Sequence, residues 1–108
     1  MFIMRIAGSV AAVLLGVVVL SAAAQERGAV EQGRQVFKDQ GCYGCHMVEK
    51  FGTPIGPDLS HVGAKHNVAY LTRWLEDPAS QKPTAHMPKI ELSKAEVASL
   101  AAYLASLR

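Results

Sequence analysis

The chain has 108 residues, of which 50% are hydrophobic and 19% are charged. A chain of this length forms one domain, and its composition excludes an intrinsically disordered protein. Eleven Lys and Arg residues against nine Asp and Glu residues leave a net charge of +2. That balance, with no basic run, excludes a dedicated nucleic-acid binder, and two cysteines are too few for a framework of several disulfides.

The first element is an apolar N-terminal segment. Arg5 precedes the uncharged residues 6–20, which are followed by Ser21-Ala22-Ala23-Ala24. A basic residue, an apolar stretch and an A-x-A site are typical of a secretory signal peptide over residues 1–24, and we expect cleavage after Ala24. A retained membrane anchor is the alternative, because residues 6–24 approach the ~20 that span a bilayer. In both cases residues 25–108 form an exported domain.

Two helices are expected next along the chain. The first covers residues 30–40, where Gly33 and Phe37 lie on one apolar stripe, and Gly33 would let another helix approach closely. The second begins after Asn67, which is a favourable N-cap. Pro78 ends it, because a proline disfavours helical backbone in the residue before it.

The third helix has the clearest start signal, the capping box Ser93-Lys94-Ala95-Glu96. An apolar stripe at helical spacing then follows, formed by Val97, Leu100, Ala101, Leu104 and Leu107. No stretch alternates as a strand would. Residues 51–63 and 78–90 read as ordered loops, and loops this long in so small a domain are usually functional. The sequence therefore predicts an all-α fold of three to four helices with long loops.

A short motif between the first helix and the first loop carries the chemistry. Its sequence is Cys42-Tyr43-Gly44-Cys45-His46, the C-x-x-C-H signature of covalent haem attachment. Cysteines three apart on a helical turn project to the same side, so both thiols can bond to the two vinyl groups of one porphyrin. His46 lies near that side and can ligate the iron. We predict that Cys42 and Cys45 hold a haem c and that His46 is an axial ligand.

Other uses of a C-x-x-C pair fit this chain less well. A thioredoxin-like redox pair needs a βαβ context, and no strand pattern is present. A zinc site needs a second Cys or His pair at finger spacing, which the sequence lacks. A plain disulfide across a two-residue gap would constrain almost no chain.

The second axial ligand is identified by elimination among four methionines. Two lie in the export segment, and Met47 directly follows the proximal histidine, so it cannot reach the other face. Met87 remains, in the second loop, and we predict it as the ligand. A histidine pair would give a lower reduction potential than a His/Met pair. The alternative ligands are the other histidines, which are His61, His66 and His86.

The order and spacing of these residues resemble those of a class I, single-haem c-type cytochrome. The resemblance covers essentially residues 25–108. Besides the C-x-x-C-H motif it rests on Gly56-Pro57-Asp58-Leu59 with Val62-Gly63, on Met87-Pro88 and on the closing helix that ends in Ala102-Tyr103-Leu104. It implies a cytochrome c fold, in which three to four helices and long loops wrap around one covalently bound haem.

The resemblance also implies roles for further residues. Gly33 and Phe37 match positions at which the N-terminal helix crosses the C-terminal helix. Pro57 matches the proline whose carbonyl accepts the proton-bearing nitrogen of the proximal histidine. Tyr70 and Trp74 lie where such proteins place aromatic side chains against the haem or its propionates. Ordinary packing of their helix is the alternative for these two.

With both axial positions filled by protein, we expect no substrate at the iron and no enzyme activity. The expected function is an exported single-electron carrier, a periplasmic monomer that meets a donor and an acceptor protein in transient contacts. Nucleic acid is not an expected partner, and the membrane is one only if the N-terminal segment is retained. The alternative is a haem c subunit of a respiratory complex, such as nitric oxide reductase or a terminal oxidase, anchored in the inner membrane and facing the periplasm. A ligand-binding or peroxidatic haem with a labile sixth site is a third alternative.

Overall fold

The computed structural model describes the backbone of residues 4–108 and the side chains of residues 21–108. Its helices are α1 (Met4–Asp39), α2 (Val62–Lys65), α3 (Val68–Glu76), α4 (Pro78–Gln81) and α5 (Lys94–Ser106). A 3-10 turn, η1, covers Cys42–Gly44, and two short strands follow, β1 (Met47–Val48) and β2 (Phe51–Gly52). The predicted all-α class is confirmed.

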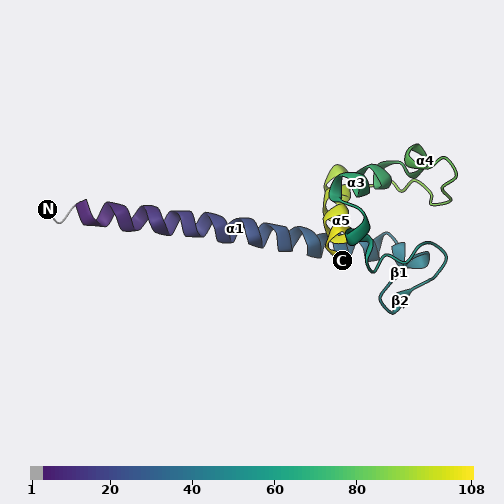
Figure 1. Cartoon of the computed structure of the whole chain (residues 1–108), viewed down its shortest axis with the longest axis horizontal. Coiled ribbons are helices and arrows are strands. Elements are labelled where there is room, and N and C mark those ends of the chain that lie inside the picture. The colour runs from purple at the N-terminus through teal and green to yellow at the C-terminus, as the bar shows by residue number, and fades with distance from the viewer. Residues whose placement is uncertain (1–3) are drawn as a thin grey trace.

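Helix α1 begins far upstream of the predicted start at residue 30 and ends one residue before the predicted end (Figure 1). Residues 21–29 are mostly good helix formers and contain no proline, so nothing there stops the helix. A signal peptide or anchor is expected over residues 1–24, and the side chains of residues 1–20 lie outside the described part of the chain. In the part of the chain that the structure describes, no helix is both long and apolar enough to cross a membrane.

Helices α1 and α5 cross at Gly33, as the resemblance to c-type cytochromes implied. A Cβ atom at Gly33 would collide with the carbonyl oxygen of Ser99 and would lie only 2.6 Å from Cβ of Tyr103. One turn later, the ring of Phe37 packs edge-on against that of Tyr103, with 5.7 Å between the centroids. The absence of a side chain at Gly33 therefore lets the two helix backbones meet.

Helices α3 and α5 start at the caps that the sequence predicted. The side chain of Asn67 accepts a hydrogen bond from the backbone N–H of Tyr70 at 2.9 Å. At α5, Ser93 Oγ accepts from the N–H of Glu96, and the Glu96 carboxylate accepts from the N–H of Ser93, at 3.1 and 2.9 Å. Both N-caps are confirmed.

Two expectations about the loops need correction. The sequence shows no strand pattern, but β1 and β2 form an antiparallel hairpin in which Met47 faces Gly52 and Val48 faces Phe51. Strands of two residues are too short for alternation to be visible. Helix α3 does end two residues before Pro78, but Pro78 also opens α4, at a first position where its missing N–H costs nothing. The one-turn helices α2 and α4 raise the number of helices over residues 4–108 to five.

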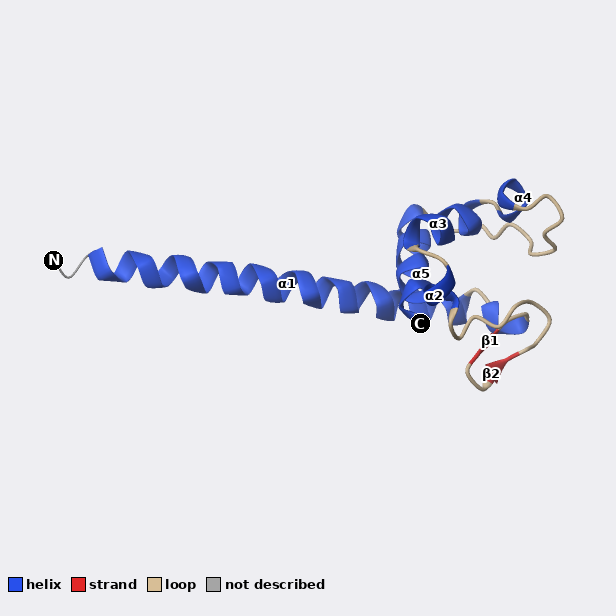
Figure 2. Ribbon diagram, in the orientation of Figure 1, coloured by secondary structure: helices blue, strands red, loops and turns tan. Residues whose placement is uncertain are grey.

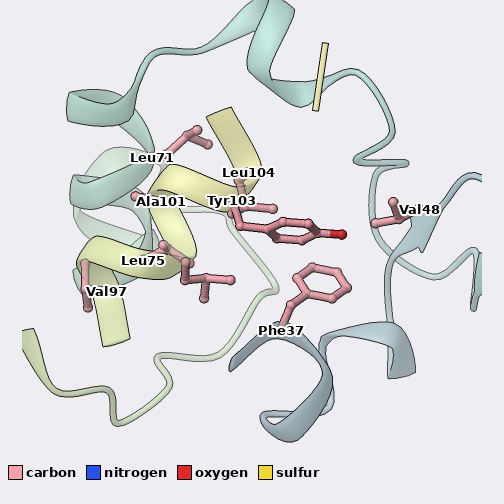
Figure 3. Packing of buried hydrophobic residues seen from close by; sticks show 9 residues of the cluster. Phe37, Val48, Leu71, Leu75, Val97, Ala101, Tyr103 and Leu104 are labelled. Carbon is pink, nitrogen blue, oxygen red and sulfur yellow. The ribbon is translucent and has the colours of Figure 1, made fainter. Parts of the chain in front are cut away.

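The hydrophobic core lies where α1, α3 and α5 meet (Figure 3). Its buried members are Phe37, Val48, Leu71, Leu75, Val97, Leu100, Ala101, Tyr103 and Leu104. The loops between α1 and α3 and between α3 and α5 both project away from the crossing of α1 and α5, on the side opposite the long end of α1 (Figure 2). The packed helices thus form a base from which two loop regions extend.

Candidate functional site

A cavity of about 450 Å³ opens between the two loop regions. This volume is within the range of pockets that bind small molecules and cofactors. Its walls come from the C-x-x-C-H turn and the loop after it, from α3, from the segment after α4 and from α5, and most of the lining side chains are apolar. All the site residues predicted from the sequence line this one cavity: Cys42, Cys45, His46, Pro57, Tyr70, Trp74 and Met87.

The two cysteines stand on the 3-10 turn η1, which begins at Cys42 and has Cys45 as its C-cap. Gly41 precedes the turn with φ +74°, in the left-handed region that glycine adopts without strain. The N–H of Cys45 then bonds to the carbonyl of Cys42 at 3.2 Å, three residues back. Both cysteines line the same cavity, so the turn presents the two thiols on one side. Both are free, and burial raises the pKa of the Cys42 thiol above its ordinary value.

His46 is held by the backbone of the loop opposite. Its Nδ1 lies 2.7 Å from the carbonyl oxygen of Pro57. A carbonyl only accepts, so Nδ1 carries the proton and the lone pair of Nε2 is left for a metal. A Cβ atom at Gly56 would lie 2.8 Å from Cε1 of the imidazole, so the missing side chain leaves room for the ring.

Asp58 and Ser60, to which the sequence patterns assigned no role, hold this loop in place. The N–H of Ser60 bonds to Oδ1 of Asp58 at 2.8 Å, and Ser60 Oγ accepts from the N–H of Glu49 at 2.6 Å. The hydrogen bonds from Ser60 also keep the pKa of Asp58 below its ordinary value. The Asp58-Leu59-Ser60 spacing is an Asx-turn pattern, which is the signal that could have identified them. These bonds fix the loop that carries the Pro57 carbonyl.

Met87 reaches the cavity from the irregular segment after α4. Its sulfur lies 3.2 Å from Nε1 of Trp74, which stands on α3. The remaining methionine of the domain, Met47, lies in β1 and is not among the lining residues. Met87 is therefore the thioether that the fold brings into the cavity with the imidazole of His46.

The alternative histidine ligands are placed differently from one another. Nδ1 of His61 lies 3.1 Å from the carbonyl oxygen of Arg108, and His61 does not line the cavity. His66 and His86 do line it. The ring of His66 is stacked on that of Tyr70, with 3.9 Å between centroids and 13° between planes. His86 is exposed to solvent.

The residues present fit a haem. Two free thiols, an imidazole with an available nitrogen and a thioether sulfur line one mainly apolar cavity. Imidazole and thioether are the axial ligands of electron-transferring haems, and thiols are the groups that attach one covalently. Apolar walls restrict the access of water, which is one of the means by which a protein sets a reduction potential.

Comparison with known proteins agrees with this chemistry. A family model described as cytochrome c matches residues 30–108. A protein of Alkalihalophilus pseudofirmus named cytochrome c oxidase subunit 2 is 37% identical over 86 residues, covering 71% of this chain and 25% of that protein. A protein of the same name from Bacillus subtilis is 32% identical over 100 residues, covering 77% of this chain and 28% of its own length. The chain thus spans about a quarter of the length of these curated relatives.

The family match contains the end of α1, the whole cavity and α5, so it covers every element that forms the site. The helix crossing at Gly33 and the pairing of His46 with Pro57 are features that the resemblance to c-type cytochromes implied. The chain therefore belongs to the cytochrome c family, whose members carry electrons on an iron-containing haem.

Proposed function

We propose that this chain is an exported single-electron carrier with a covalently attached haem c. Cys42 and Cys45 would form the thioether links, and His46 and Met87 would be the axial ligands. The observation that carries the proposal is that both thiols, the imidazole and the thioether sulfur line the same cavity. When bound, a haem supplies a one-electron ferrous/ferric couple.

The protein's own residues would prepare the site for that couple. The carbonyl of Pro57 keeps the proton on Nδ1 of His46, so Nε2 stays available and the ring stays oriented. The apolar wall from α3 and α5 limits the entry of water. Because both axial positions would be taken by side chains, no position would be left for a substrate. We therefore propose electron transfer without catalysis by this chain alone.

Partners would meet the protein at the open side of the cavity. Small, weak contacts suit the fast turnover of electron transfer proteins. We propose the periplasm as the compartment and transient donor and acceptor proteins as the partners, with the chain acting as a monomer once its N-terminal segment is cleaved.

A second candidate function is a tethered haem c subunit of a respiratory oxidase. It is favoured by the names of the two relatives, both of which are cytochrome c oxidase subunit 2. It is also compatible with the continuous backbone of α1, which runs from Met4 into the helix crossing. In this case the N-terminal segment would stay in the inner membrane, with the haem domain facing the periplasm and a fixed partner receiving the electron.

Intact mass of the protein from soluble and membrane fractions of its host tests both candidates. An 84-residue chain, from residues 25–108, plus one haem in the soluble fraction supports the mobile carrier. The full chain plus one haem in the membrane fraction supports the tethered subunit and overturns the mobile carrier. A chain without haem in both fractions contradicts covalent attachment and with it both candidates.

A further inference from the structure

We propose that the N-terminus of the exported chain is a modification site, at which the side chain of Gln25 closes on its own backbone nitrogen to give pyroglutamate. The inference rests on the proposed function, because it takes the chain as cleaved after Ala24. It adds a covalent change at the start of the exported part of α1, which electron transfer by the haem does not require.

The chemistry follows from the residue after the predicted cleavage site. Cleavage would release an α-amino group on Gln25, beside the residue's own side-chain amide. Part of such an amine is uncharged near neutral pH, since its ordinary pKa is about 7.7–8. The amine nitrogen attacks the amide carbon Cδ, a bond forms between these two atoms, and the bond from Cδ to Nε2 breaks. Nε2 leaves as ammonia with a proton from the amine, so no oxidant or other co-reactant is needed.

The structure leaves this part of α1 open to solvent. The N-terminal part of the helix extends away from the rest of the protein (Figure 1). Residues 24–28 are exposed, and their side chains make no hydrogen bond or ion pair within the described residues 21–108. Val30 is the first residue with a described side chain that packs against the core. Residues 24–29 can therefore unwind for cleavage and ring closure without disturbing the core.

Cleavage would also weaken the helix at its new end. In a continuous α-helix, the N–H groups of residues 25–28 bond to the carbonyls of residues 21–24. Cleavage removes these carbonyls, and the first N–H groups of a helix have no partner within it. Gly28 lies in the same turn and is a poor helix former. The amine and the amide of Gln25 would thus be free to meet.

Ring closure would then strengthen this turn. The ammonium group of an unmodified end would stand at the positive end of the helix dipole, where a cation is destabilising. The nitrogen of pyroglutamate belongs to an amide and carries no charge, like that of an acetylated N-terminus. We expect the modified end to be more helical than an unmodified one at neutral pH, and the difference to shrink once the amine is uncharged.

The intact mass of the holoprotein, freshly isolated from the soluble fraction, tests the modification. We expect the mass of residues 25–108 with one haem, lower by the mass of one ammonia. An amine-selective reagent should label the lysines and leave residue 25 unlabelled. Pyroglutamyl aminopeptidase should remove residue 25 and expose a new amine on Glu26. The intact mass is measured before any digestion, because N-terminal glutamine in peptides also cyclises during handling.

Two substitutions test the effect of the ring on the helix. Gln25→Met removes the amide, so this end keeps a free amine, and methionine is as good a helix former as glutamine. Gln32→Met, at an exposed position on the same helix, is the matched control. At about pH 7, the ratio of helical to unwound forms over residues 26–29, from carbon chemical shifts, should be about two- to fivefold lower in Gln25→Met than in the wild type. The difference should shrink above about pH 9, and Gln32→Met should match the wild type in this ratio and in the loss of ammonia.

Two results would overturn the modification. The first is a chain of residues 25–108 that carries haem, keeps the ammonia and accepts the amine label. The second is a soluble haem protein that begins at a residue other than 25, which leaves the carrier function intact. Equal helix populations in the wild type and Gln25→Met at both pH values would overturn the effect on α1. A full-length chain with haem in the membrane fraction is a different outcome, because it contradicts the proposed mobile carrier itself.

Discussion

Gly33 provides a quantitative test of the helix crossing that supports the site. In Gly33→Ala, the new methyl group would lie 2.6 Å from Cβ of Tyr103, where ordinary contact begins at 3.4 Å, so this pair alone requires 0.8 Å of separation. The carbonyl oxygen of Ser99 is closer still and belongs to the backbone, so it cannot rotate away. Helices α1 and α5 must therefore move apart.

The expected cost combines three contributions. Overpacking costs about 1–3 kcal/mol, and loss of the edge-on contact between Phe37 and Tyr103 costs about 0.5–1.5 kcal/mol. Better helix propensity returns about 1 kcal/mol. The free energy of unfolding should thus fall by about 2 kcal/mol, which lowers Tm by roughly 8–16 °C in a domain of this size.

The matched control is Gly28→Ala on the same helix. Gly28 is exposed, and a Cβ atom there would meet nothing within 4 Å, so the substitution should stabilise the holoprotein by up to about 1 kcal/mol. Guanidinium and thermal unfolding of both holoproteins, followed by far-UV circular dichroism, measure the two effects. If Gly33→Ala were as stable as Gly28→Ala, the close crossing of α1 and α5 would be wrong.

Three further predictions concern the cap of α5 and the cofactor. Ser93→Ala removes the acceptor for the N–H of Glu96 and should lower the free energy of unfolding by about 1 kcal/mol in denaturant titrations. Hydrogen bonds from Ser93 lower the pKa of Glu96 in the folded protein below its value in the unfolded chain. The ionised carboxylate therefore stabilises the fold fully at pH values above the pKa of the unfolded chain. This stabilisation is lost as the pH falls through the pKa of the folded protein. Below about pH 4, the free energy of unfolding should therefore fall more steeply with decreasing pH in the wild type than in Glu96→Gln, which keeps the capping hydrogen bond without the charge. Parallel pH profiles of the two proteins would contradict this. Finally, the chain without haem should be largely unfolded by circular dichroism, because an open apolar cavity replaces part of its core, and near-native helix content would refute that expectation.

The helix starts and the helix crossing could be predicted from the sequence, because residues close together in the chain determine them. The caps at Asn67 and Ser93 follow from side chains that bond to the next turn, and the crossing at Gly33 follows from a glycine on an apolar stripe. The upstream extension of α1 was not predicted, because an apolar stripe indicates the buried part of a helix and not its full length. The β1–β2 hairpin was not predicted either, because each strand has only two residues.

The composition of the site was more predictable than its contacts. The C-x-x-C-H spacing and the elimination among methionines selected residues that the fold brings to one cavity. The bond between Trp74 and Met87 depends on the path of the loop between them, which no local pattern encodes. The same holds for the support of Pro57 by Asp58 and Ser60, although a turn pattern was present there.

The reduction potential and oxidised spectrum of Met87→Ala test the central claim most directly. Met47→Leu is the control, because Met47 lies outside the cavity lining. Loss of the thioether should lower the potential and abolish the sulfur-to-iron band in Met87→Ala, since a His/Met pair gives a higher potential than the ligand sets that would replace it. Met47→Leu should keep both wild-type properties. An unchanged potential and spectrum in Met87→Ala would contradict the assignment of His46 and Met87 as the axial pair.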